Sequence, residues 1–214
     1  MTGLSNGSGL ADVDSGLPPG RVVAGGIVDT LAVNDSSASA REANAETIQA
    51  AIDYAHANAL GVIDIGSGVI HSDPFYLDAP GNLRSGLATP TIFNFSMHLR
   101  GAGRTGGTGH GTELRFADNS TPVLIVGTGQ GMKVTGLTVM YGGAAPSSRA
   151  ALPPNGIGIA LAGGSGGLSR CELDVDVIGF RTGVKTGFNS DSLCDALTMW
   201  RPFIKDCLIA VDIG

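Results

Sequence analysis

The feature that most constrains this chain is a change of period at Gly61. Before it, "AETIQAAIDYAHANAL" carries small apolar residues at three- and four-residue spacing, which is typical of an amphipathic helix. Ser39 and Glu42 have the spacing of a capping box, and Asn44 offers a second possible start. The pattern predicts a helix over 40–58, ended by Gly61, whose apolar face comprises Ile48, Ala51, Ile52, Ala55 and Ala59.

After Gly61 the sequence breaks into short β-type runs bounded by Gly, Asn, Asp or Pro, beginning with "GVIDIGSGVIHS". No second amphipathic helix of comparable length follows, which argues against a βαβ fold. The chain contains 34 glycines and only 5% aromatic residues, a composition that suits short strands joined by many tight turns. We therefore expect an all-β fold.

Internal repeats sharpen this expectation. The triplet at 173–175 resembles that at 197–199, 24 residues later, and 180–184 resembles 207–211, 27 residues later. The triplet at 137–139 stands 36 residues before 173–175, with 142–155 as an apparent loop insertion. A period in the twenties with insertions predicts a solenoid. The short strands favour a right-handed, single-stranded parallel β-helix over a leucine-rich repeat, whose asparagine pattern is missing.

A β-helix exposes unpaired strand edges at its end, and a helix with a small-residue face suits a lid there. We expect an arm without regular structure over 1–25, a cap over 26–60 that includes the helix, and β-helix coils over 61–214. The last run, "CLIAVDIG", is apolar and is followed by no capping helix, charged edge or proline. This predicts that coils continue past 214 or that another chain covers this end.

Composition also narrows the function. The net charge is −6 with no basic cluster, so we expect no nucleic-acid partner, and no apolar run is long enough for membrane insertion. The histidines show no metal-ligand spacing, and nothing predicts a metal or cofactor. The three cysteines, Cys171, Cys194 and Cys207, are expected to be buried free thiols.

Several phrases resemble the pectate-lyase-like β-helix family. They are "TIQAAIDYA", "GVIDIGSGVI", "LRGAG" and "TEL", in that order, after an Asn34-Asp35 turn. The chain departs from the family pattern where the turn usually reads G-D-G, and where Gly66 replaces a proline. The resemblance covers about 28–140 in phrasing and implies the parallel β-helix fold.

The family includes polysaccharide lyases and hydrolases as well as bacteriophage tail spikes, so the fold does not fix the function. The resemblance, with the unstructured arm, favours a virion appendage: the N-terminal region of a tail spike or tail fibre that recognises a host-surface polysaccharide. In that reading 1–25 bind other tail or adaptor proteins, and the chain is a homotrimer located in the virion. A polysaccharide-degrading hydrolase or lyase, virion-bound or extracellular, remains the alternative, and an adhesin-like surface protein is a third.

The clearest candidate chemistry lies in "RCELDVDVIG". On a strand, Glu172, Asp174 and Asp176 would face outward, opposite an apolar inner face. Carboxylates two residues apart on a strand are about 6.5–7 Å apart, near the separation that inverting glycosidases use. Asp174 and Asp176 are the candidate acid and base of a hydrolase, with Glu172 as alternate.

The chain's single tryptophan, Trp200, is predicted to share this outer face with Thr198 in the next coil, and would suit stacking on sugar rings. The competing interpretation is a solvated acidic face with no catalytic role. The glycine-rich stretch "GAGRTGGTGHG" at 101–111 lacks the G-K-[ST] ending of a phosphate loop and is expected to be a turn or loop.

Overall fold

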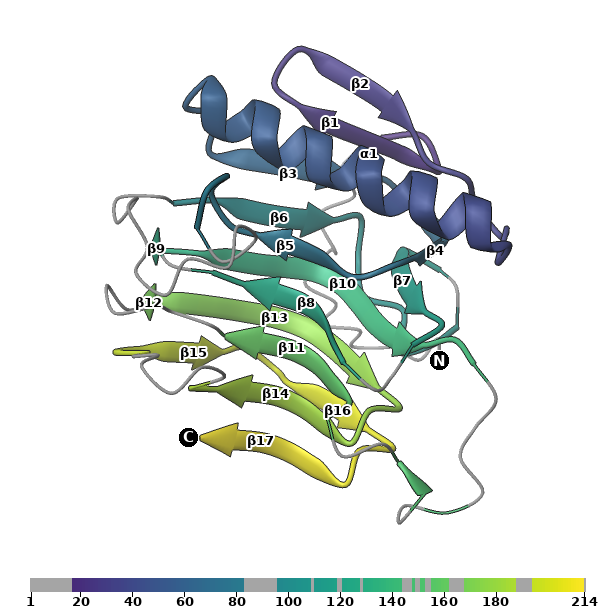
Figure 1. Cartoon of the computed structure of the whole chain (residues 1–214), viewed down its shortest axis with the longest axis vertical. Helices are drawn as coiled ribbons and strands as arrows, with labels where there is room; N and C mark the ends of the chain where they lie inside the picture. Colours follow the sequence, from purple (N-terminus) through teal and green to yellow (C-terminus); the bar gives the residue numbers. More distant parts are fainter. Residues whose placement is uncertain are drawn as a thin grey trace, which may run out of the picture.

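A computed structural model describes residues 17–82, 96–108, 110–118, 121–127, 129–143, 148, 151–152, 155–161, 168–187 and 194–213. In this part of the chain the fold is mostly β-sheet with one α-helix, α1 (Ala38–Ala57), which lies across one end of a stack of strands (Figure 1). The predicted all-β class is confirmed at that level.

The ends of α1 differ from the predicted ends. Ser37, rather than Ser39 or Asn44, is the N-cap, and its hydroxyl accepts a hydrogen bond from the Ala40 N–H at 3.3 Å. Several Ser and Asn residues precede the helix, and the pattern of spacing alone does not choose between them. Asn58 forms the C-cap, and Ala59 turns into the left-handed region at φ 53°, so the helix ends before Gly61.

The inner face of α1 is the predicted one over Ile48, Ala51, Ile52 and Ala55, all buried, whereas Ala59 lies beyond the helix and is exposed. Asn44 is buried on the same face: its side-chain oxygen accepts from the Ala32 N–H at 2.8 Å. Its amide N–H groups donate to the carbonyl oxygens of Ala32 and His71 at 2.9 and 2.8 Å.

The first strands form a hairpin beside α1. Strands β1 (Arg21–Ala24) and β2 (Ile27–Thr30) pair antiparallel, and β1 also pairs antiparallel with β3 (Val62–Ile65). The prediction that the whole of 1–25 lacks regular structure is therefore wrong for 21–24, because Val22 and Ala24 alternate into the core. Residues 1–16 lie outside the described part of the chain.

After α1, strands recur in groups along the chain. The first two groups are β3, β4 (Gly68–Ser72) and β5 (Phe75–Leu77), then β6 (His98–Gly101), β7 (Thr112–Phe116) and β8 (Pro122–Val126). In the next two groups one long strand replaces two short ones: β10 (Lys133–Tyr141) and β11 (Ile157–Leu161), then β13 (Cys171–Ile178) and β14 (Thr182–Thr186). The last group is β15 (Leu197–Met199), β16 (Phe203–Lys205) and β17 (Ile209–Ile213).

Each strand pairs in parallel with its counterpart in the next group. A ten-stranded sheet has the order β15-β13-β10-β6-β3-β1-β2 and also holds β4, β7 and β16. A five-stranded sheet has the order β17-β14-β11-β8-β5, and β9 (Gly129–Gln130) pairs with β12 (Leu168–Ser169). The inner side chains of the two larger sheets meet in one apolar core, whose top is covered by α1 (Figure 1).

Two of the three predicted repeat offsets are wrong by two residues. Leu173 pairs with Met199 and Leu137 with Val175, whereas the predicted offset of Val184 to Val211 is confirmed. A shift of two residues returns every side chain to the same face of a strand, so the hydrophobic pattern cannot distinguish the two registers.

A bulge in β10 positions the site described below. The register with β13 shifts between Thr135 and Leu137, where Gly136 has a φ of +66°. A Cβ on the facing Gly101 would lie 2.3 Å from the Gly136 carbonyl oxygen, so only glycine fits there. Because of the bulge, Leu137 turns into the core and Thr138 outward, toward β13 and the loop after β6.

Candidate functional site

The three carboxylates of β13 point outward, as predicted, and Leu173, Val175 and Val177 between them are buried in the core. Their surroundings differ sharply along the strand. Asp176 is covered, Asp174 is held between two arginines, and Glu172 is the most accessible of the three. The sequence predicted the shared face but not this gradient.

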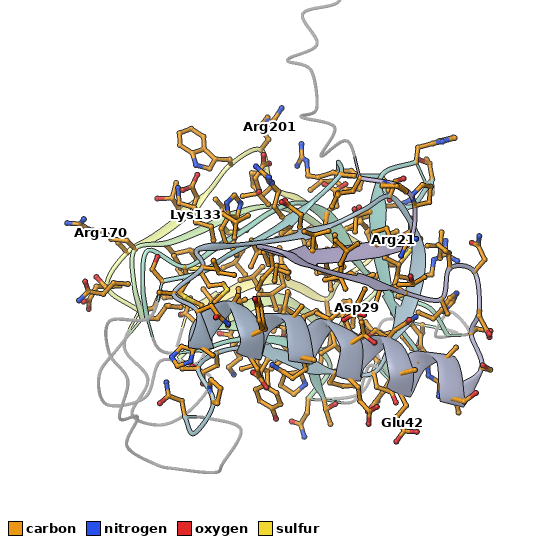
Figure 2. All side chains as sticks on the ribbon, turned by 90° about the horizontal axis from the view of Figure 1, so that it is seen from above. Arg21, Asp29, Glu42, Lys133, Arg170 and Arg201 are labelled. Carbon is orange, nitrogen blue, oxygen red and sulfur yellow. The ribbon has the colours of Figure 1, made fainter. Side chains whose placement is uncertain are left out.

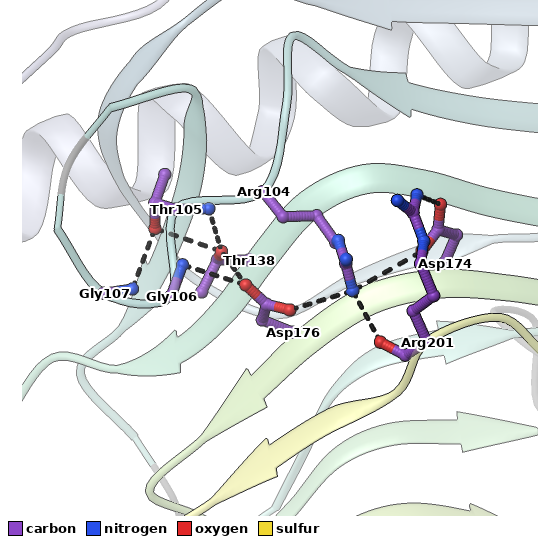
Figure 3. Close-up of polar contacts among 8 residues, drawn as sticks. All are labelled: Arg104, Thr105, Gly106, Gly107, Thr138, Asp174, Asp176 and Arg201. Atoms are coloured by element: carbon purple, nitrogen blue, oxygen red, sulfur yellow. Dashed lines mark hydrogen bonds and ion pairs between the residues drawn. The ribbon is translucent and has the colours of Figure 1, made fainter. Parts of the chain in front are cut away.

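Asp176 is only 4% exposed although it lies outside the apolar core. Its Oδ2 accepts a hydrogen bond from the Gly106 N–H at 2.9 Å and lies 3.4 Å from the Thr138 hydroxyl. Its Oδ1 accepts from Arg104 Nη1 at 3.2 Å (Figure 3). Both oxygens therefore have partners from the protein itself.

The cover over Asp176 comes from the loop after β6, the glycine-rich stretch of the sequence. Thr105 is the central residue: its hydroxyl donates to Glu113 Oε2 at 2.7 Å, and its N–H donates to Thr138 Oγ1 at 2.9 Å. Gly107 donates its N–H back to Thr105 Oγ1 at 3.0 Å (Figure 3). We call Thr105, Glu113, Thr138 and Asp176, all buried, the buried cluster. Beyond the last residue of β6, the described residues of 101–111 form turns and bends, which confirms the predicted loop.

Burial is the main influence on the acidity of Asp176. Loss of solvent raises its pKa above the ordinary value, and the negative charge of Asp174 acts in the same direction. The Gly106 N–H, the Arg104 charge and the Thr138 hydroxyl oppose this shift without cancelling it. A raised pKa is the direction expected for a general acid, but the loop separates this carboxyl from solvent.

Asp174 lies between Arg104 and Arg201. Arg104 Nη1 is 3.5 Å from Asp174 Oδ1, and Arg201 Nη2 is 3.0 Å from Asp174 Oδ2. The two arginines are also joined directly, because Arg104 Nη1 donates to the Arg201 carbonyl oxygen at 2.7 Å. Asp174 Oδ1 is shielded from solvent and has no hydrogen-bond donor among the described residues. The sequence pattern indicates neither arginine, since each lies between strands and follows no strand period.

Glu172 occupies the open part of the same face. It pairs with Lys133 Nζ at 2.6 Å, and this hydrogen bond is the main cause of its lowered pKa. The side chain of Trp200 also hydrogen-bonds Glu172, and Thr198 lies beside Glu172 in the register of β13 with β15. Both residues are exposed, as predicted, Trp200 by 54%.

These side chains form one continuous surface. We call Lys133, Glu172, Asp174, Thr198 and Trp200 the outer stripe. Seen down the stack, Lys133 and Arg201 lie on one side of the molecule and Glu42 of α1 on the opposite side (Figure 2). His98 extends the stripe toward the helix: it lies beside Lys133 in the register, and its Nε2 is 2.7 Å from Thr135 Oγ1. Burial, followed by the charges of Arg100 and Lys133, lowers the pKa of His98.

The other predicted groups fall outside this surface. Cys171, Cys194 and Cys207 are free, but only Cys171 is fully buried, since the other two lie in the less covered last group of strands. Among the described residues no group of three His, Cys, Asp or Glu side chains could hold a metal ion. In the same part of the chain, no helix is long and apolar enough to cross a membrane.

No model of a known protein family matches the chain, and no characterised protein or solved structure is significantly similar to it. Membership of the pectate-lyase-like family therefore stays a prediction from the sequence phrases. The catalytic roles of Asp174, Asp176 and Glu172, and the sugar-binding roles of Trp200 and Thr198, also stay predictions. What the structure adds is which of these residues a large ligand can reach.

Proposed function

We propose that the parallel strand groups are coils of a right-handed parallel β-helix and that the chain recognises a host-surface glycan as part of a bacteriophage tail spike or tail fibre. The observation that carries the glycan proposal is the exposed Trp200 beside Glu172 and Lys133 on a parallel strand ladder. An exposed aromatic ring next to charged hydrogen-bonding groups matches the two surfaces of a sugar ring, one apolar and one polar.

Binding fits this surface better than hydrolysis. A hydrolase of the inverting type needs two carboxyl groups that both reach the scissile bond. Asp176 is under the loop after β6 with both oxygens occupied, and Asp174 forms ion pairs with two arginines. The accessible residues of the outer stripe, in contrast, present a hydrogen-bonding carboxylate, an ammonium group and an indole ring.

A polysaccharide hydrolase or lyase is the second candidate, and the raised pKa of Asp176 beside Asp174 is the observation that favours it. Cleavage would require the loop after β6, which contains Thr105, to move away from Asp176. Product release from capsular or O-antigen polysaccharides that Asp174→Asn abolishes, with folding intact, would support this candidate. Undiminished product release in that variant would place the catalytic site elsewhere.

The partner proposals rest on the sequence alone. We propose that residues 1–25 attach to other virion proteins and that the chain assembles as a homotrimer. Light scattering of the purified chain would give the oligomeric state. Virion incorporation that is unchanged after deletion of 1–16 would exclude an anchoring role for those residues.

Glycan recognition is tested by calorimetric titration with host capsular and O-antigen polysaccharides. We expect Trp200→Ala to weaken binding by about 1–3 kcal/mol, the usual cost of losing an aromatic anchor at a binding site. Val28→Ala is the control, because Val28 is also an exposed apolar residue but lies in β2, at the other end of the stack. Equal affinities of the wild-type chain and Trp200→Ala would refute the outer stripe as the binding surface.

A further inference from the structure

A second surface lies on the five-stranded sheet, away from the outer stripe. A groove of about 500 Å³ crosses the start of four consecutive strands, β8, β11, β14 and β17. Their first residues, Pro122, Ile157, Thr182 and Ile209, are aligned in the parallel register and all line it. The outer stripe belongs to the ten-stranded sheet, so the two surfaces share no strand.

Three apolar residues contribute to the floor of this groove, together with the polar Thr182, which lies between Ile157 and Ile209 in the register. Pro122, Ile157 and Ile209 provide side chains without hydrogen-bonding groups, and Ile209 is 40% exposed. The apolar side chains on either side of Thr182 offer contact area to the face of a ring-shaped ligand. The polar and charged residues that also line the groove determine which charged groups the ligand must carry.

The charges in the groove are unequal. Lys185 Nζ pairs with Asp212 Oδ2 at 3.1 Å, so these two charges offset each other. Arg181 Nη1 donates to the Leu152 carbonyl oxygen at 3.2 Å, a neutral acceptor. In the described part of the chain, no carboxylate lies within ion-pair distance of Arg181. The groove therefore retains one positive charge, although the chain as a whole has a net charge of −6.

We propose that this groove binds a ring-shaped ligand carrying one oxyanion, a carboxylate or a phosphate, with Arg181 as its partner. A guanidinium has five N–H donors arranged in a fork, and its one hydrogen bond to Leu152 leaves donors for both oxygens of such an anion. Asp212 opposes the anion and sets the strength of binding. The groove is a specific site independent of the proposed glycan surface.

The test is a titration of the ¹⁵N-labelled chain with sodium glucuronate, with inorganic phosphate and with neutral glucose, followed by NMR. We expect glucuronate, and more weakly phosphate, but not glucose, to shift the Arg181 Nε–Hε signal and the Thr182 amide with one saturating curve. Arg181→Gln should weaken this binding about tenfold or more, because a charge-assisted bidentate contact is lost. Asp212→Asn should strengthen it, which separates a loss of charge complementarity from a loss of folding.

Two variants serve as controls. Arg170→Gln removes an exposed arginine elsewhere on the chain (Figure 2) and should leave the affinity unchanged. Trp200→Ala should also leave it unchanged, so the outcome does not depend on the glycan proposal. Binding of phosphate but not glucuronate would show an anion site without a ring and would overturn the ring-shaped ligand. The proposal is overturned if neither anion binds, if glucose binds equally, or if Arg181→Gln and Arg170→Gln behave alike.

Discussion

The two ends of the strand stack bury the same kinds of residue to very different extents. At the covered end, beneath α1 and the β1–β2 hairpin, Ile63, Ile65 and Leu77 have no exposure. At the open end, formed by β15, β16 and β17, Met199 is half-buried and Ile213 is 80% exposed. Strand sequence does not explain the contrast, since both ends alternate apolar residues inward.

The difference shows that an inward-facing residue needs a neighbour on both sides of its strand. Thr186, paired with Ile213, is buried although it is polar, because β14 lies between β11 and β17. Ile213 is exposed because, in the described chain, β17 pairs only with β14. Burial in such a stack is therefore a property of the interface between groups of strands rather than of one strand.

The largest predicted effect compares one isoleucine at each end. Ile52→Ala removes a fully buried side chain from the inner face of α1 and should lower the free energy of unfolding by about 2–5 kcal/mol. Ile213→Ala should change it by less than about 0.5 kcal/mol, because this side chain is already in solvent. Urea unfolding of both variants gives the two values. Similar losses would contradict the contrast between the ends.

A smaller effect concerns how α1 covers the edge of the five-stranded sheet. The side-chain amide of Gln49 accepts a hydrogen bond from the Tyr76 N–H and donates one to the Tyr76 carbonyl oxygen, each at 3.0 Å. These two bonds replace those that a neighbouring strand would make with β5. Gln49→Leu should destabilise the chain by about 1–3 kcal/mol, since it leaves backbone groups without partners. Gln130→Leu, at an exposed glutamine, is the matched control in the same unfolding measurement. Equal stabilities of the two variants would exclude this role of Gln49.

The same contrast of covered and open positions occurs within β13 and predicts opposite pH dependences. Asp176, covered, has a raised pKa, so its contribution to stability falls as pH rises through the interval above the ordinary Asp value of 3.8. Asp176→Asn lacks this fall and should gain stability relative to the wild-type chain as pH rises. A relative loss instead would show that the Arg104 ion pair outweighs burial.

Glu172, the most accessible of the three carboxylates, has a lowered pKa. Its contribution to the free energy of unfolding is therefore present above the ordinary Glu pKa of 4.5 and lost as pH falls below that value. Glu172→Gln should therefore lose stability relative to the wild-type chain near neutral pH and recover it in acid. The effect should be under about 1 kcal/mol, because the Lys133 pair is partly exposed and solvent weakens it. Stability curves that run parallel at all pH values would contradict a paired Glu172.

Much of the fold is visible in the sequence because it depends on periodicity. The helix face at Ile48 and Ile52, the strands around Gly66, and the alternation of β13 all follow from apolar spacing. The register of the strands was harder to predict, since a shift by two residues leaves every side chain on the same face of the sheet. The hairpin strand β1 was not predicted, because its four residues lie between glycines and prolines and show only a weak alternation.

The site was less predictable than the fold. The outward direction of Glu172, Asp174 and Asp176 is a local property of one strand, and the sequence shows it. The cover over Asp176 depends on Gly106 and Arg104, about 70 residues earlier in the chain. Contacts at that separation follow from how the strand groups stack, and no local pattern of residues encodes them.

Amide hydrogen exchange, resolved by strand, tests the central claim most directly. We expect slow exchange in β3, β4 and β5 beneath α1, and exchange at least about tenfold faster in β15, β16 and β17, because their groups are covered on one side only. Ile52→Ala should accelerate exchange at the covered end and leave the open end unchanged. Equal protection of the two ends in the isolated chain, or a uniform response to Ile52→Ala, would contradict the account.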